Sequence, residues 1–358
     1  MSKKEFIPQE LPINIHLDIK IYELLSKASG RLGELKGFAK TIPNQDILIN
    51  SLLLQEAKDS NAIENIITTH DELFLAQIDE SKITKNAKEV QNYELALKLG
   101  IRLIKKENLL RNKHILEIQK RLERNYAGFR TQSGTMLKNP ATGEIKHIPP
   151  QHKDDILRLM NNLESYINED LDNFDPLIKL AIIHYQFETI HPFYDGNGRV
   201  GRILNILYLV FKERLDTPIL YLSAYIIKHK DKYYHLLEQV SKNAAWNEWI
   251  VYILQGIEKT SIATIQRIKD IDKAMKDAAE VLQNNADKIY SKDLIEALFF
   301  YPYTKIEFLE KKLKISRQSA SKYLKTCEKL TLLECIKIGR NKYFINVRLF
   351  KILSNPLI

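Results

Sequence analysis

The chain has 358 residues and a mass of 41.8 kDa, with 44% hydrophobic and 28% charged residues, a length and composition typical of a globular protein with two or three domains. No apolar run reaches the roughly 18 residues of a membrane span, the first ten residues lack the apolar stretch of a signal peptide, and the two cysteines are too few for a disulfide framework. We therefore expect a cytoplasmic protein without a membrane partner.

The net charge of +9 belongs to one end of the chain. Residues 288–358 contain 15 Lys and Arg against 6 Asp and Glu, which leaves the first 287 residues neutral. A basic C-terminal module is therefore the part of the chain whose charge favours contact with nucleic acid.

Glycine and proline are sparse, and apolar residues recur at helical spacing along most of the chain, which predicts a mostly α-helical fold. We expect a helix over residues 17–35, interrupted at Gly30 and Gly33, and an amphipathic helix over 46–56. Two further helices are expected within 69–104 and one over 114–122. We assign all of them to packing.

A short polar string, SNAIEN at residues 60–65, follows the helix expected at 46–56. Ser60 and Glu64 are four residues apart, a spacing that places both on one face of a helix. Taken alone the pattern is weak evidence, because a solvated helix face or a helix cap has the same spacing.

Residues 135–150 favour extended structure around a turn. Asn139 with Pro140, and Thr142 with Gly143, are turn pairs flanked by short β-capable arms. The segment is a candidate hairpin in an otherwise helical protein, and a plain connecting loop is the simpler alternative.

The most distinctive stretch is HPFYDGNGRVGR at residues 191–202, between apolar runs at 177–190 and 203–211. Asp175 can cap the first run as a helix, with Pro176 at its first position. The glycines at 196 and 198 predict a turn, after which a second helix begins. Its free backbone N–H groups would form a cradle for phosphate.

The same loop supplies the side chains that phosphoryl or nucleotidyl transfer requires. His191 can act as a base, and Asp195 can hold Mg²⁺. The candidate phosphate-binding residues are Gly196, Asn197, Gly198, Arg199 and Arg202.

A metal-binding face is a rival interpretation, because His184, Glu188 and His191 lie at i, i+4 and i+7. Pro192 is expected to end the helix at His191, and no other ligand lies nearby in the sequence. We therefore favour His184 as a packed helix residue.

The C-terminal part begins with helices expected over 249–258 and, as a charged linker, over 262–285. From about Tyr290, helices over 294–299, 306–313 and 316–330 and strands over 332–338 and 342–345 predict a winged helix-turn-helix domain. Ser316 would cap its third helix, which offers Arg317, Gln318, Ser319, Lys322 and Lys325 to a DNA groove. A protein-binding or dimerising role is an equal alternative for this module.

The stretch at 191–202 matches the motif H-P-F-x-[D/E]-G-N-G-R-x-x-R of the Fic (Fic/DOC) family at every defined position. The chain therefore resembles a Fic protein adenylyltransferase, over about residues 50–258. The resemblance implies a Fic-type helical bundle with a small β-hairpin flap. It also implies transfer of AMP from ATP, with Mg²⁺ held by Asp195, to a Tyr, Thr or Ser hydroxyl of a target protein. His191 is then the base, and pyrophosphate is released.

The resemblance also implies roles outside the motif. Residues 60–65 resemble the family's inhibitory pattern, [S/T]-x-x-x-E-[G/N], so Glu64 is expected to pair with Arg202 and to disturb the site of the ATP γ-phosphate. The flap edge that holds the target's main chain would be Ile145, Lys146, His147 and Ile148. Tyr233 or Tyr234 would border the adenine, although core packing is the simpler role for both. Ser241 stands where some relatives have Asn, which leaves the adenine contacts open.

We expect four regions: an N-terminal helical region with the inhibitory helix (1–110), the Fic core (111–258), a helical linker (259–287) and the winged-helix domain (288–358). Two other functions stay open. One is a DNA-binding regulator whose Fic core is only a sensor. The other is the reverse reaction, hydrolytic removal of AMP with Glu64 positioning a water. A homodimer is also left open.

Overall fold

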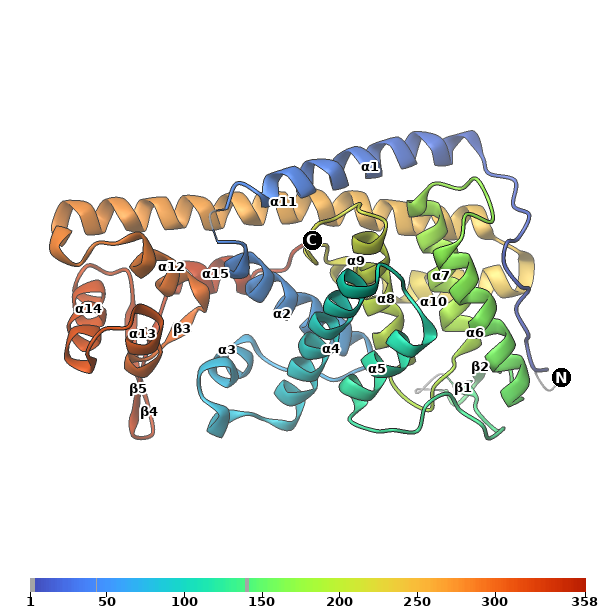
Figure 1. The fold of residues 1–358 in the computed structure, drawn as a ribbon, viewed down its shortest axis with the longest axis horizontal. Coiled ribbons are helices and arrows are strands. Elements are labelled where there is room, and N and C mark those ends of the chain that lie inside the picture. Colours follow the sequence, from blue (N-terminus) through green and yellow to red (C-terminus); the bar gives the residue numbers. More distant parts are fainter. Residues whose placement is uncertain (1–3, 43, 139–141) are drawn as a thin grey trace.

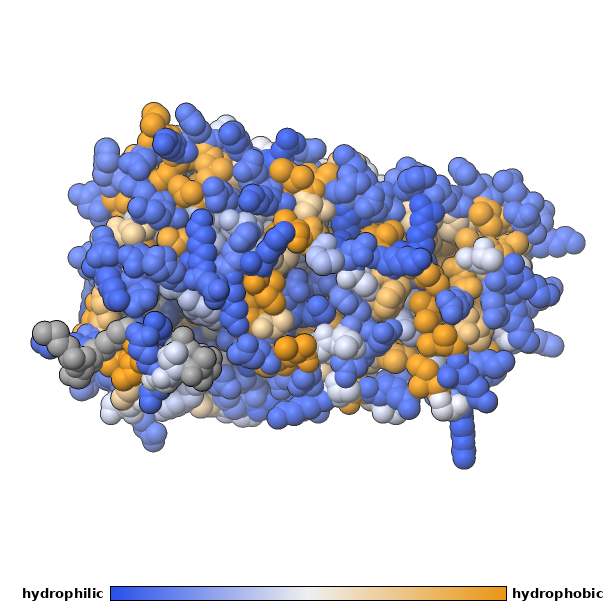
Figure 2. Space-filling view, turned by 180° about the vertical axis from the view of Figure 1, so that it is seen from behind, coloured by the Kyte–Doolittle hydropathy of each residue, from blue (hydrophilic) through white to orange (hydrophobic). Residues whose placement is uncertain are grey.

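In the computed structural model, which describes residues 4–42, 44–138 and 142–358, the chain is an elongated and largely helical molecule (Figure 1). Among the described residues no helix has both the length and the apolar character needed to cross a membrane. Figure 2 shows the face opposite to that of Figure 1, where hydrophilic side chains cover most of the surface.

Two long helices run side by side along one edge of the molecule (Figure 1). α1 spans Ile19–Ala39 without a break at Gly30 or Gly33, and α11 spans Trp246–Asn285 as one helix of 40 residues. The prediction of two separate helices at 249–258 and 262–285 is therefore wrong. The residues between them, Thr260 and Ser261, are buried, and the Thr260 hydroxyl donates to the carbonyl of Gly256 within the helix at 2.6 Å.

The helices below this pair form the bundle that carries the loop of residues 191–202. Their bounds are α2 Gln45–Ile63, α3 His70–Ile78, α4 Lys85–Glu107, α5 Asn112–Glu123, α6 Lys153–Asn168, α7 Pro176–Ile190, α8 Asn197–Phe211, α9 Leu222–Lys228 and α10 Lys230–Asn243, with a 3₁₀ turn η1 at Glu80–Lys82. α7 is buried on nearly all sides, because apolar residues lie all around its circumference, and Lys179, His184 and Gln186 are buried with them. Asp175 caps it by accepting a hydrogen bond from Leu177 N at 2.8 Å, as its sequence predicts.

A two-stranded hairpin lies beside the end of α7. β1 (Leu137–Lys138) pairs antiparallel with β2 (Ile145–His147), with Leu137 opposite His147. The expected turn pair Asn139 and Pro140 lies outside the described residues. A hairpin, and not a plain loop, is therefore what the described arms form.

The C-terminal part is a separate unit at one end of α11. It contains η2 Asp287–Ile289, α12 Lys292–Phe300, β3 Tyr303–Thr304, α13 Ile306–Leu313, α14 Arg317–Lys329, β4 Glu334–Ile338, β5 Asn341–Ile345 and α15 Val347–Ser354. The strands form an antiparallel sheet in the order β3-β5-β4. The sequence interpretation found the three helices and the hairpin, and it missed β3 and α15, whose few residues show no repeated pattern.

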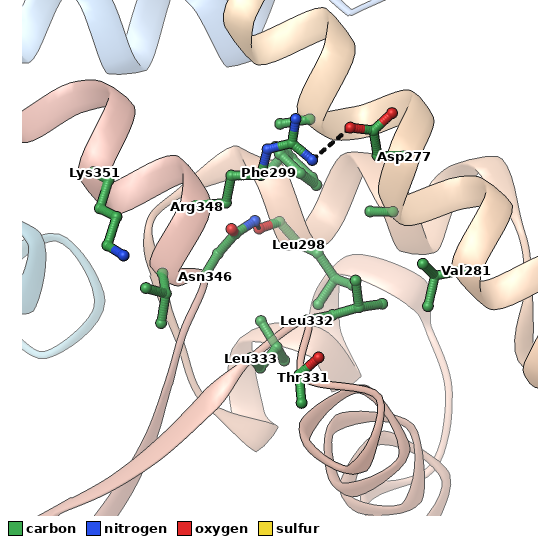
Figure 3. Close-up of a pocket in the computed structure, with 13 residues that line it drawn as sticks. Asp277, Val281, Leu298, Phe299, Thr331, Leu332, Leu333, Asn346, Arg348 and Lys351 are labelled. Carbon is green, nitrogen blue, oxygen red and sulfur yellow. Dashed lines mark hydrogen bonds and ion pairs between the residues drawn. The ribbon is translucent and has the colours of Figure 1, made fainter.

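Side chains from α11, α12 and α15 meet around a cavity of about 340 Å³ where this unit joins α11 (Figure 3). Ala278, Val281 and Leu298 are among its apolar lining, and an ion pair between Asp277 and Arg348, 2.6 Å apart, lies at its edge. The unit also contacts the bundle. The hydroxyl of Tyr303 donates to Asp71 on α3, and that of Tyr343 donates to Asp79 at the end of α3, each at 2.5 Å.

Candidate active site

His191 ends helix α7 in a left-handed conformation, with φ 50° and ψ 58°, and its N–H still bonds to the carbonyl of Phe187. Few residues other than glycine adopt this conformation, so the surrounding structure must hold it. Arg130 does so: it is fully buried, its side chain donates to the carbonyl of His191 at 2.8 Å, and its backbone N–H donates to the carbonyl of Pro192.

Arg130 was not foreseen from the sequence. A single arginine after a loop glycine carries no motif, and only the folded chain shows that its guanidinium also donates to the carbonyls of Ile190 and Pro150. Arg130 therefore ties the hairpin segment to the end of α7. We assign it a positioning role for His191.

Burial lowers the pKa of His191 to about 4, and the nearby His147 and Arg130 act in the same direction. The imidazole is therefore neutral at neutral pH, which is the form that can accept a proton.

The turn after His191 aims the first turn of α8 at the same space. Gly196 has φ 81°, and Asn197 closes the turn, because its side chain accepts from the N–H of Phe193 and donates to its carbonyl, both at 2.8 Å. The first N–H groups of α8 have no partner within the helix and form a site for an anion.

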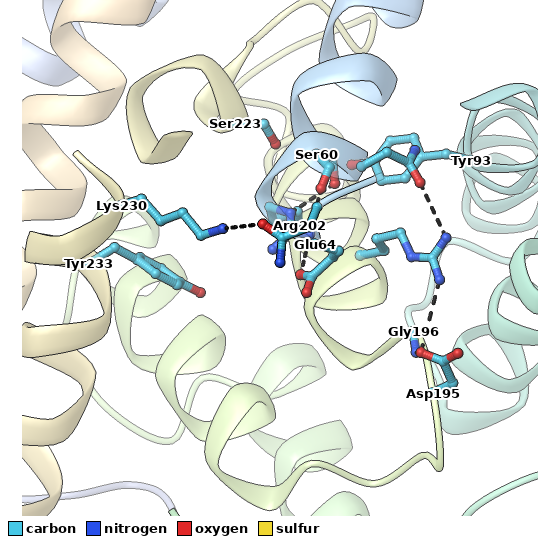
Figure 4. Close-up of polar contacts among 12 residues, drawn as sticks. Ser60, Glu64, Tyr93, Asp195, Gly196, Arg202, Ser223, Lys230 and Tyr233 are labelled. Carbon is cyan, nitrogen blue, oxygen red and sulfur yellow. Dashed lines mark hydrogen bonds and ion pairs between the residues drawn. The ribbon is translucent and has the colours of Figure 1, made fainter. Parts of the chain in front are cut away.

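The carboxylate of Glu64 reaches this anion site (Figure 4). A Cβ atom added to Gly198 would collide with it, so the glycine leaves the room that the carboxylate fills. Arg202 donates to the Oε1 atom of Glu64 at 2.7 Å, and also to the hydroxyl of Ser60 at 2.8 Å and to its carbonyl at 2.9 Å.

The pairing of Glu64 with Arg202 is thus present. Arg202 is 2% exposed. Burial on its own would raise the pKa of Glu64, but the charge of Arg202 and its hydrogen bond outweigh burial and lower it, so Glu64 is ionised at neutral pH. Ser60 lies within α2, whereas Glu64 caps its C-terminal end.

Arg199 has different surroundings from those expected of an open phosphate clamp. Its guanidinium is buried between Glu123 at 2.8 Å, Glu89 at 3.1 Å and the side-chain oxygen of Asn61 at 3.2 Å. These three partners come from α5, α4 and α2, so Arg199 joins three helices at the site. None of the three was foreseen, because a lone acid or amide on a helix has no distinguishing pattern.

Asp195 lies at the mouth of the loop with 77% of its side chain exposed, and it accepts a hydrogen bond from the N–H of Gly196 at 2.7 Å. Among the described residues no three or more His, Cys, Asp and Glu side chains gather as a metal-binding cluster. A single open carboxylate beside an anion site suits Mg²⁺, which commonly takes one or two protein carboxylates and completes its shell with phosphate oxygens and water.

His184 and Tyr233 belong to the core. The two ring nitrogens of His184 lie 2.9 Å from the hydroxyl of Tyr233 and 3.1 Å from the side-chain nitrogen of Asn205, which accounts for both without a metal. Tyr233 is 1% exposed, whereas Tyr234 is 45% exposed, so only Tyr234 offers surface to a base.

The hairpin lies next to the loop of residues 191–202. His147 on β2 is 2.9 Å from the carbonyl of Thr189, two residues before His191. Ile145 and His147 are half-buried and Lys146 is exposed, while Ile148 follows directly after the strand.

Comparison with known proteins decides the family. Residues 22–102 match the N-terminal region of the Fic/DOC family and residues 109–209 match the Fic/DOC family itself. The chain belongs to the Fic/DOC family. Residues 274–349 match the C-terminal domain described as protein adenylyltransferase SoFic-like.

Relatives named protein adenylyltransferase Fic share part of the sequence of this Fic protein. The protein from Aedes aegypti is 26% identical over 249 residues, which are 68% of this chain and 48% of that one. The protein from Drosophila melanogaster is 32% identical over 115 residues, which are 32% of this chain and 22% of that one. The chain spans about half the length of the Aedes aegypti relative. Its match to the Drosophila melanogaster relative covers 22% of that protein.

Solved structures share the fold. A Fic family protein from Desulfovibrio desulfuricans G20 superposes with a TM-score of 0.60 at 18% identity, covering 92% of this chain and 97% of that one. Fic-1 from C. elegans has a TM-score of 0.54 at 18% identity, covering 70% of this chain and 72% of that one.

Proposed function

We propose that this Fic protein is a protein adenylyltransferase, an enzyme that transfers AMP from ATP to a hydroxyl group of a target protein. The observation that carries the proposal is the position of a neutral His191 beside an anion site that Arg202 and the first turn of α8 form. Family membership and the names of the relatives support the same activity.

The residues of the site can take the proton and hold the phosphates that this reaction requires. The imidazole of His191 takes the proton from the target hydroxyl, and its oxygen forms a bond to the α-phosphorus of ATP while the bond to the β-phosphate oxygen breaks. Pyrophosphate leaves, and AMP stays on the target. The amides of Gly196, Asn197 and Gly198 and the guanidinium of Arg202 hold the phosphates in line.

Asp195 is the residue that would hold Mg²⁺, which, when bound, neutralises charge on the phosphates. Arg199 contributes by position: it fixes α2, α4 and α5 around the loop. Tyr234 is the better candidate of the two tyrosines for contact with the adenine, since its ring has exposed surface.

We further propose that Glu64 inhibits this activity in cis. Its carboxylate bonds to Arg202 and packs on Gly198, where a phosphate of bound ATP would need both groups. ATP in the productive position and Glu64 therefore compete.

The test is incubation of the chain and of its Glu64→Gly variant with α-labelled ATP, CTP, GTP or UTP and Mg²⁺, followed by mass spectrometry of modified hydroxyl residues. We expect AMP on Tyr, Thr or Ser, lost in His191→Ala by a factor of about 10²–10⁴. A His191→Ala variant that keeps more than about a tenth of the activity would exclude His191 as the base.

The reverse activity is a second candidate, since Glu64 lies close enough to the anion site to orient a water. Incubation of a target already carrying AMP, with Mg²⁺ and without ATP, would release AMP from that target if Glu64 acts in this way. Release that is the same in Glu64→Gly would exclude this role.

The C-terminal unit, from about residue 288, has the order of helices and strands expected of a winged helix, and we propose that it binds DNA through α14. The exposed residues of that helix include Arg317, Gln318, Lys322 and Lys325. A protein-binding or dimerising role, as in a homodimer, is the alternative.

The two cysteines, 327 and 335, are free, which suits a reducing cytoplasm. The division 1–110, 111–258, 259–287 and 288–358 is likewise a proposal.

A further inference from the structure

The segment before α1 crosses the bundle and ends at the flap. Three contacts fix its middle. Gln186 donates to the carbonyl of Gln9 at 2.8 Å, Glu10 forms an ion pair with Arg158, and the backbone of Leu11 exchanges two hydrogen bonds with Asn162, each at 2.7 Å. We call residues 4–11 the arm.

Beyond these anchors the arm pairs with the flap itself. The N–H of Phe6 donates to the carbonyl of Ile148 at 2.9 Å. The ring of Phe6 lies against that of His147, with centroids 5.9 Å apart. The carboxylate of Glu5 accepts from the N–H of Gln151 at 2.6 Å.

These contacts have the form of peptide recognition by an added strand, in which main-chain hydrogen bonds give affinity and side-chain contacts give specificity. Ile148 is one of the four residues expected to hold the main chain of a target. Its carbonyl is already bonded to the chain's own backbone, and His147 already carries an aromatic ring. His147 in turn is 2.9 Å from the carbonyl of Thr189, so the occupied surface adjoins the catalytic loop.

We propose that the arm occupies the target-docking position of the flap in the resting protein, and that the target is an extended segment with an aromatic side chain that packs on His147. This inference rests on the proposed function, in which the flap holds the target. Phe6 has no hydroxyl group, so at that position the arm fills the surface without accepting AMP. Glu64 would then block the nucleotide, and the arm would independently block the target.

Peptide binding tests the inference without any need for activity. A variant that lacks residues 1–8 keeps Gln9, Glu10 and Leu11 and so keeps all three anchors. A fluorescent peptide of residues 4–8, KEFIP, should bind it at least about ten-fold more tightly than it binds the full chain, where the arm competes at high effective concentration.

Two altered peptides give the matched comparison. Phe6→Ala in the peptide should weaken binding about three- to ten-fold through the loss of the ring contact. Ile7→Ala should leave it unchanged, because the side chain of Ile7 is 46% exposed in the arm. Equal binding of the peptide to the full chain and the shortened one, or equal binding of the Phe6→Ala peptide, would overturn the inference.

Transfer of labelled AMP gives the second readout, in the Glu64→Gly background and with a tagged His191→Ala copy of the full chain as acceptor. Removal of residues 1–8 should raise transfer about three-fold or more at unchanged affinity for ATP, and added KEFIP should reverse the gain. A fall in transfer would mean that the arm only supports the flap and would overturn the inference. If no variant transfers AMP, the proposed function fails, and the peptide experiment still decides whether the arm occupies the flap.

Discussion

At the scale of single residues, the carboxylate of Glu64 is the most consequential group in the site. It is bonded to a buried guanidinium, and it lies so close to the α8 N-terminus that a Cβ atom at position 198 would collide with it. Both features favour a bound anion, and Glu64 supplies that anion from the chain itself.

Glu64→Gly should therefore raise transfer of AMP at least about ten-fold, because the triphosphate can then settle with its α-phosphorus in line. Self-modification with labelled ATP measures the effect, and Glu23→Gly on the exposed side of α1 is the control. Arg202→Ala added to Glu64→Gly should cancel the gain, because the clamp is then missing. Equal activity of Glu64→Gly and the unaltered chain, with ATP bound equally by both, would remove Glu64 from the inhibitory role.

The pH dependence of AMP transfer by the Glu64→Gly variant follows from the pKa of His191. Its pKa is lowered to about 4 by burial, so the neutral base persists as pH falls well below 6.5 and is lost only as pH passes through about 4. Between about pH 6 and pH 8, the ratio kcat/KM for ATP should therefore show no fall due to protonation of His191. A fall with a midpoint near 6.5 would show that the site is more open to water than in this structure.

At the scale of elements, α2 is held by side-chain and backbone groups of α4, α8 and α9. Glu56 accepts from the hydroxyl of Tyr93 on α4 and from the N–H of Ser223 on α9, each at 3.1 Å, while Asn61 bonds to Arg199 on α8. Helix α3, which follows α2, is held in turn by the C-terminal unit. The position of Glu64 is thus a property of several packed elements and not of its own helix.

The contact of the C-terminal unit with α3 gives a prediction at this scale. Tyr343→Phe removes the hydroxyl that donates to Asp79, and we expect the free energy of unfolding to fall by about 1–3 kcal/mol. Tyr323→Phe on α14, which lies away from this contact, is the control. Thermal unfolding measures both, and an equal small effect of the two would show that the contact adds little stability.

The same contact has a pH signature. The hydrogen bonds from Tyr343 and Ser81 lower the pKa of Asp79 to about 2. Because the folded pKa lies below the ordinary value of about 3.9, the stabilisation is fully present above pH 4 and is lost as pH falls from 4 to 2. The difference in stability between the unaltered chain and Tyr343→Phe should therefore shrink over that interval.

At the scale of the whole molecule, α11 extends from the catalytic bundle to the basic C-terminal unit, and α15 packs against it (Figure 1). If the unit binds DNA, reversing two charges on the exposed face of α14 should reduce the salt dependence of the DNA affinity. For Lys322→Glu with Lys325→Glu in the full chain, the slope of log K against log salt should become shallower by about 2.

Fluorescence anisotropy with a duplex at several salt concentrations measures this slope. Lys20→Glu with Lys27→Glu on α1 changes the net charge by the same amount on another surface and should leave the slope nearly unchanged. No binding to any duplex at low salt would assign the unit to protein contacts.

The sequence by itself determined the class of fold and the local conformation of the loop at 191–202. Asp175, Pro176 and the glycines at 196 and 198 are local signals, since caps and turns depend on the conformation of a few neighbouring residues. The pairing of Glu64 with Arg202 was also within reach, because the resemblance to the family named the partner, whereas the bonds from Arg202 to Ser60 came only from the structure.

Only the tertiary structure decided what surrounds those residues. Arg130, Asn61, Glu89 and Glu123 reach the site from four separate places in the chain, and their contacts with His191 and Arg199 depend on how whole helices pack. The same holds for the arm, whose Phe6 meets Ile148, 142 positions further along the chain. The continuity of α11 was missed for a related reason: a polar stretch such as Lys-Thr-Ser at 259–261 resembles a linker until the burial of Thr260 and Ser261 shows that neighbouring helices cover them. Contacts between distant segments leave no local pattern, so packing alone decides them.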